Sequence, residues 1–161
     1  MQKITPFLWF NTEAEEAAKF YTSIFKKSKI GKATRYDKDS DNPSGLPRGS
    51  VMTVPFKIAG QEFTAINGGP IFKFTEAISF VIKCKDQKEV DYYWEKLTSG
   101  GQEVQCGWLK DKYGLSWQIV PEMLTKMIGD KNPQRAARIF QAMLSMKKIE
   151  IQPLKDAYAG R

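Results

Sequence analysis

The chain has 161 residues, of which 42% are hydrophobic, with ten Phe and four Trp among them. This content is enough to bury a core, so it excludes a globally disordered chain and suits one domain or two small modules. The net charge is +7, but it is spread thinly and no basic stripe interleaves with aromatics, so nucleic acid is not the expected partner.

Histidine is absent from the chain, which removes the commonest metal ligand and excludes Ser-His and Cys-His nucleophile pairs. The two cysteines, Cys84 and Cys106, lack zinc-site spacing and form no disulfide framework, so we expect small core residues and a cytoplasmic protein. We expect neither a signal peptide nor membrane association, because no apolar run approaches about 18 residues.

The first part of the chain predicts a strand, a helix and further strands. The helix is expected to follow Thr12 as its cap, with Glu15 closing a capping box. A polar loop is expected over residues 37–47, and a hairpin turn at Ala59-Gly60. The predicted strands cover residues 7–10, 30–36, 51–58 and 61–66.

The second part repeats this order. Asp86 is the predicted cap of a helix, with Glu89 three residues later, and Gly100-Gly101 ends it. The predicted strands cover residues 77–84, 102–108 and 115–120. Helices are then expected over residues 121–128, from Asn132-Pro133 onward and after Pro153.

The two parts correspond at fixed offsets, which indicates a duplicated unit. Phe7 matches Phe80 at an offset of 73, and Thr64 matches Gln118 at an offset of 54. A pseudo-twofold relation of this kind allows equivalent positions to be compared within one chain.

Several segments resemble the PhnB-like proteins, often labelled 3-demethylubiquinone-9 3-methyltransferase-like, of the vicinal oxygen chelate superfamily (glyoxalases, extradiol dioxygenases and bleomycin-resistance proteins). These segments are Gly-Gly-Pro at 68–70, Gln105–Asp111 and Tyr113–Pro121, and the similarity extends over essentially the whole chain. The resemblance implies an α+β fold of paired βαβββ modules, with a curled mixed sheet around a cavity and helices at the C-terminus. We expect module one at about 1–72 and module two at about 73–128, together one domain over 1–128. The helical tail, 129–161, is expected at a homodimer interface.

Metal-dependent members of the superfamily take two ligands from each module, on the first and last strands. The offsets place these positions at Pro6, Thr64, Ser79 and Gln118, none of which is anionic or an imidazole. We therefore expect neither a metal nor another cofactor. A methyltransferase is not expected either, because the Gly-rich turn of a methyl-donor site is missing.

The leading hypothesis is a metal-independent small-molecule-binding protein with a cavity between the two sheet halves. Strand alternation indicates which side chains contact the ligand. They are Leu8, Phe10, Thr64, Ile66, Ser79, Val81, Trp108 and Gln118. Two alternatives stay open: a glyoxalase- or dioxygenase-type enzyme acting on a small oxygenated substrate, and a nucleic-acid or regulatory module suggested only by the charge.

Overall fold

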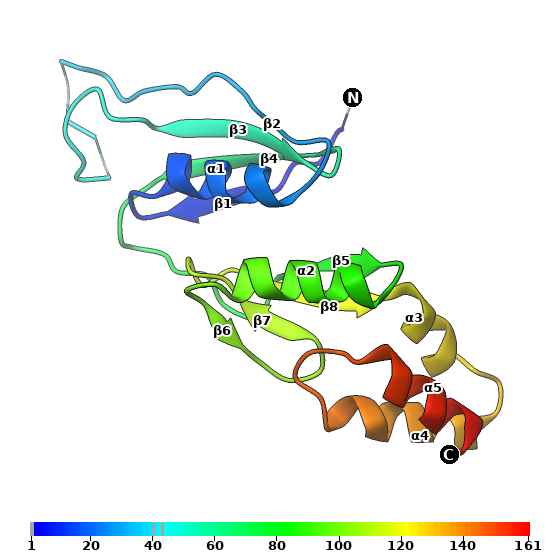
Figure 1. Cartoon of the computed structure of the whole chain (residues 1–161). Coiled ribbons are helices and arrows are strands. Elements are labelled where there is room, and N and C mark those ends of the chain that lie inside the picture. The colour runs from blue at the N-terminus through cyan, green and yellow to red at the C-terminus, as the bar shows by residue number, and fades with distance from the viewer. Residues whose placement is uncertain (1, 40, 43) are drawn as a thin grey trace. The chain divides into compact units, whose positions relative to one another are not determined.

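The structure is a computed structural model that describes residues 2–39, 41–42 and 44–161. The chain divides into two compact units, Met1–Phe74 and Thr75–Arg161 (Figure 1). The predicted loop over residues 37–47 includes Ser40 and Pro43, which lie outside the described residues. Each unit is described by itself below.

The first unit contains one helix and one four-stranded mixed sheet. Its elements are β1 (Phe7–Phe10), α1 (Ala14–Ile24), β2 (Lys29–Ile30), β3 (Thr53–Ile58) and β4 (Gln61–Asn67). The strand order is β1-β4-β3-β2, with β1 parallel to β4 and the other pairs antiparallel. The hairpin at Ala59-Gly60 is confirmed, since both residues have positive φ as a tight β-turn requires.

The predicted strand over residues 30–36 is wrong beyond Ile30. The Thr34 N–H donates to the Thr53 carbonyl at 2.9 Å, and Arg35 forms an isolated bridge with Val51. This segment therefore runs beside β3 without a continuous ladder.

The predicted cap of α1 is also wrong. The helix begins at Ala14 after Glu13, and no side chain of that N-cap residue bonds the helix. Instead, the Oδ1 atom of Asn67, at the end of β4, accepts the Ala14 N–H at 2.8 Å. Asn67 lies far along the chain, so only the folded sheet brings this acceptor to the helix end.

The second unit repeats the same order of elements. They are β5 (Ser79–Cys84), α2 (Gln87–Thr98), β6 (Gln102–Glu103), β7 (Trp108–Lys110) and β8 (Ser116–Pro121), in the order β5-β8-β7-β6. Asp86 caps α2 as predicted, because its carboxylate accepts the Glu89 N–H at 3.0 Å. The predicted strand over 102–108 is interrupted by a turn in which Cys106 (φ 58°) and Gly107 (φ 82°) both have positive φ.

Three helices complete the second unit: α3 (Glu122–Ile128), α4 (Pro133–Leu144) and α5 (Ile151–Ala159). Asn132 caps α4 as predicted, accepting the Gln134 and Arg135 N–H groups. A buried cluster of Leu124, Ile139, Ile149 and Leu154 joins these helices. The side chain of Gln87 also ties the tail to α2, because it accepts the Ile151 N–H and donates to the Ile149 carbonyl.

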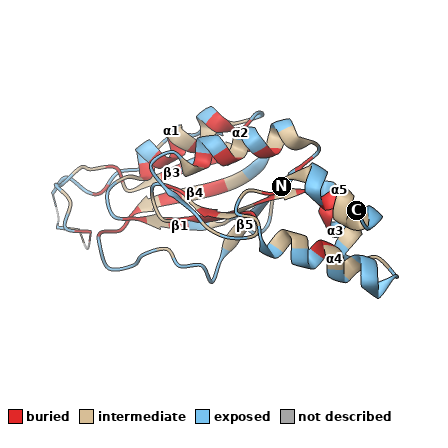
Figure 2. Ribbon diagram, turned by 60° about the horizontal axis from the view of Figure 1, so that its bottom comes forward, coloured by how far each residue is buried: buried red, intermediate tan, exposed pale blue. Residues whose placement is uncertain are grey.

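Each sheet has one face covered by the helix of its own unit, and the buried residues gather between them (Figure 2). On α1, Tyr21 stacks against Phe56 of β3. We call the other face of each sheet its open face. The prediction of an α+β fold with paired βαβββ modules and C-terminal helices is confirmed. Among the described residues, none of the helices is long and apolar enough to cross a membrane.

Candidate functional site

The register of β1 against β4 decides which side chains lie on the open face of the first sheet. Phe7 pairs with Thr64 and Leu8 pairs with Ala65. In a parallel pair, directly aligned residues point to the same side, so Phe7 and Trp9 share a face with Thr64 and Ile66. Leu8 and Phe10 instead lie on the α1 side, where they are 6% and 3% exposed.

The sequence-based prediction placed Leu8 and Phe10 on the same face as Thr64 and Ile66. In the structure the two pairs lie on opposite faces of the sheet. Alternation within each strand was predicted correctly, but alternation alone leaves the register between strands open. Phe7, which was not among the expected contacts, is 59% exposed on the open face.

Trp9 is held in place on the open face of the first sheet. Its indole N–H donates to the Gly69 carbonyl at 2.9 Å, and its ring meets Phe72 edge-on with centroids 4.9 Å apart. A Cβ on Gly68 would lie 2.2 Å from the Trp9 ring, so only glycine fits beneath it. Phe72 is itself 61% exposed, which makes this end of the face apolar.

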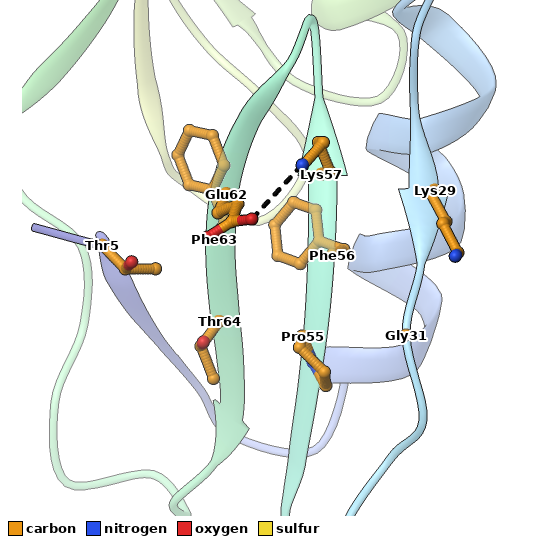
Figure 3. A pocket seen from close by; sticks show the side chains of 9 residues that line it. All are labelled: Thr5, Lys29, Gly31, Pro55, Phe56, Lys57, Glu62, Phe63 and Thr64. Carbon is orange, nitrogen blue, oxygen red and sulfur yellow. Dashed lines mark ion pairs between the residues drawn. The ribbon is translucent and has the colours of Figure 1, made fainter. Parts of the chain in front are cut away.

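A pocket of about 470 Å³ opens on the same face of the first sheet (Figure 3). Charged side chains lie along one side of it: Lys29 is the cross-strand partner of Lys57, which in turn pairs with Glu62. The Lys57 ammonium lies 3.2 Å from the Glu62 carboxylate. The remaining lining residues are Thr5, Gly31, Pro55, Phe56, Phe63 and Thr64.

In the second sheet, all four predicted contacts share the open face. Gln118 is the register partner of both Val81 and Trp108, and its amide donates to the Ser79 hydroxyl at 2.9 Å. Val81 is 52% exposed, and the other three are partly buried. This set combines an apolar surface with an amide and a hydroxyl whose orientations are fixed by one hydrogen bond.

Two further polar features border this set. Ser116 is the register partner of Ser79 and is 1% exposed, and its hydroxyl has no hydrogen-bond partner among the described residues. Lys110, which pairs with Ser116, forms an ion pair with Glu76. The hydrogen bond from Lys110 is the main reason that the pKa of the exposed Glu76 carboxyl is lowered.

Neither cysteine lies on the open face of a sheet. Cys84 is fully buried on the α2 side, and burial raises its pKa to about 12, so it stays protonated near neutral pH. Its prediction as a core residue is confirmed, whereas Cys106 is partly exposed in the β6–β7 turn.

The two registers also correct the comparison between modules. Phe7 pairs with Thr64 in the first unit, and Val81 pairs with Gln118 in the second. If Thr64 corresponds to Gln118, at an offset of 54, then Phe7 corresponds to Val81, at an offset of 74. The residue equivalent to Ser79 is thus Thr5, not Pro6. The offset falls to 73 at the helices, because Asn11–Glu13 separate β1 from α1 whereas only Lys85 and Asp86 separate β5 from α2.

Two βαβββ units of this topology define a fold of the glyoxalase and bleomycin-resistance type. Residues 2–120 match the family described as 3-demethylubiquinone-9 3-methyltransferase, and the chain belongs to this PhnB-like family. The PhnB protein of Bacillus cereus is 39% identical, with a TM-score of 0.66 over 74% of this chain and 99% of that chain. No curated protein matches the chain.

More distant solved structures share the fold alone. Protein PA1353 from Pseudomonas aeruginosa is 18% identical, with a TM-score of 0.61 over 76% of this chain and 98% of that chain. The fosfomycin resistance protein FosX from Listeria monocytogenes, solved with Mn(II) and sulfate, is 15% identical. Its TM-score is 0.53 over 80% of this chain and 98% of that chain.

The residues at the metal-ligand positions do not fit a divalent cation. With the corrected register these positions hold Thr5, Thr64, Ser79 and Gln118, which offer only neutral oxygens. Within the described part of the chain, His, Cys, Asp and Glu form no group of three or more that could hold a metal ion. Asn67, three residues after Thr64 on β4, uses its amide on the Ala14 N–H and the Val51 carbonyl. A divalent ion favours anionic or imidazole ligands, which these positions lack.

Proposed function

We propose that this protein binds a small organic molecule on an open sheet face without the help of a metal ion. The observation that carries the proposal is the Gln118–Ser79 hydrogen bond, which lies on an open face beside Val81 and Trp108. Ligand sites typically combine apolar walls with a few oriented polar groups. Thr64 and Ile66 supply the corresponding polar and apolar pair on the first sheet.

The test is a ligand screen by amide NMR with the full-length ¹⁵N-labelled chain and a library of neutral and charged metabolites and antibiotics. Binding should shift the amide signals of Ser79, Val81 and Gln118. Gln118→Ala should weaken a hit about five- to tenfold, as expected for a lost hydrogen bond of about 1 kcal/mol with some lost packing. Gln141→Ala, on an exposed position of α4, is the matched control and should leave affinity unchanged.

The proposal is wrong if no compound shifts signals on either open face, or if Gln118→Ala and Gln141→Ala behave alike for every hit. Metal analysis of protein purified without chelators gives an independent check. One bound metal ion per chain would favour the enzyme alternative and contradict our reading of the four neutral positions.

We also propose that the protein forms a homodimer through its tail. Phe140 and Leu144 are 46% and 44% exposed on α4 of this tail, which supports a contact with a second copy. Sedimentation velocity should show a dimer that dissociates in Phe140→Ser with Leu144→Ser. A monomer at all concentrations of the unaltered chain contradicts this. The two free cysteines support placing the protein in the reducing cytoplasm.

A further inference from the structure

The pocket on the first sheet carries more positive than negative charge along one row. Lys29 on β2 and Lys57 on β3 are direct cross-strand partners. Like charges in this relation repel each other, since their Cβ atoms are about 5 Å apart. Among the described residues that line the pocket, Glu62 of β4 is the one acidic side chain, and its ion pair is with Lys57. Lys29 makes no ion pair within the described residues.

The next row of the same pocket is formed by Gly31, Pro55 and Thr64, which carry no charge. Thr64 pairs with Pro55, and the Gly31 N–H donates to the Pro55 carbonyl at 2.7 Å. A Cβ on Gly31 would lie 2.9 Å from Cγ of Pro55, so the chain keeps this position without a side chain. The hydroxyls of Thr5 and Thr64 lie at the opposite end of the pocket from Lys29 (Figure 3).

We propose that this pocket binds the oxyanion group, carboxylate or phosphoryl, of a small organic molecule. Lys29 and Lys57 supply the ammonium donors for the oxyanion, and the Thr64 hydroxyl, at the opposite end of the pocket, is available to the rest of the molecule. An anion between the lysines would remove their repulsion and give Lys29 a partner, while Lys57 would be shared with Glu62. The inference rests on the proposed function, because it names the chemical class of the ligand for the same protein.

The test uses three probes of similar shape: benzoate, phenylphosphonate and neutral benzamide. With the full-length ¹⁵N-labelled chain at neutral pH, both anions should shift the amide signals of Lys57 and Thr64 more strongly than benzamide does. Raising the salt concentration from about 50 mM to about 500 mM should weaken the binding of both anions and leave the binding of benzamide unchanged. Tighter binding of phenylphosphonate assigns the phosphoryl class, and equal or tighter binding of benzoate assigns the carboxylate class.

Two variants should change anion affinity in opposite directions, and a third is the matched control. Lys29→Gln should weaken it about two- to fivefold, as expected for an exposed pair. Glu62→Gln should strengthen it by a similar factor, because it frees Lys57. Lys32→Gln makes the same charge change at an exposed position outside the pocket and should have no effect beyond a small salt-screened one.

The inference is overturned if benzamide binds this pocket as tightly as the anions, or if Lys29→Gln and Glu62→Gln match Lys32→Gln. Probes that shift only the Ser79 and Gln118 signals would also overturn it, but would leave the proposed function standing. If the amide signals on both open faces stay unchanged in this test and in the wider screen, both this inference and the proposed function are wrong.

Discussion

Asn67→Ala tests the claim that β4 supplies the cap of α1. Asn67 is 5% exposed, and its side chain accepts the Ala14 N–H at 2.8 Å and donates to the Val51 carbonyl at 3.1 Å. Alanine leaves both backbone groups without partners, and Ala14 and Val51 are 0% and 6% exposed. Each unsatisfied buried group costs about 1–3 kcal/mol, so we expect the first unit to lose about 2–4 kcal/mol of unfolding free energy.

The assay is urea unfolding of the full-length chain, followed by hydrogen exchange of the α1 amides to assign the loss to the first unit. Asn67→Asp separates the two bonds: its carboxylate still accepts the Ala14 N–H but cannot donate to the Val51 carbonyl, so this variant should also lose stability. Thr64→Ala, on the open face of the same strand, should stay within about 0.5 kcal/mol. The reasoning is refuted if Asn67→Ala costs less than about 1 kcal/mol, or no more than Thr64→Ala.

Three further results are expected from the second unit. Ser116→Ala should leave thermal stability unchanged or raise it, because it removes a buried hydroxyl that has no partner among the described residues; a loss above about 1 kcal/mol would contradict this. Gly107→Ala should cost more unfolding free energy than Gly114→Ala. Both glycines have positive φ, but of the two only Gly107 would also place a Cβ against backbone, 2.8 Å from the Ile119 carbonyl oxygen. Equal losses would show that φ alone matters. The pKa of Asp91 is lowered, first by the hydrogen bond from Lys148, so its small stabilising effect is present above the ordinary carboxyl pKa and is lost as pH falls through the lowered value. An NMR titration of the carboxyl carbons should show this pKa moving up in Lys148→Gln, and no movement would exclude the ion pair in solution.

Local signals in the sequence predicted most of the elements correctly. Asp86 and Asn132 cap their helices as predicted, because each cap acts within three residues and needs no other part of the fold. The hairpin at Ala59-Gly60 follows from the same kind of local chemistry. The predictions that failed depended on distant partners. The start of α1 is set by Asn67, and the strand over 102–108 is interrupted at Cys106-Gly107, whose N–H groups donate to the carbonyls of Met146 and Lys147.

The candidate site divides in the same way. Ser79, Val81, Trp108 and Gln118 were predicted on one face and lie on one face. Leu8 and Phe10 lie on the other face from Thr64. The prediction grouped them together because it applied the offset of 73, which holds at the helices, to the first strands, whose offset is 74. A one-residue slip exchanges the two faces of a strand. The charged row of Lys29, Lys57 and Glu62 was not predicted, since three short strands must pair before these side chains become neighbours.

The sequence by itself determined the duplicated βαβββ architecture, because strand and helix periodicity are properties of short segments. Only the tertiary structure decided the register of β1 against β4, and with it which side chains line each open face. Register depends on hydrogen bonds between residues far apart in the chain, and periodicity within one strand carries no information about them.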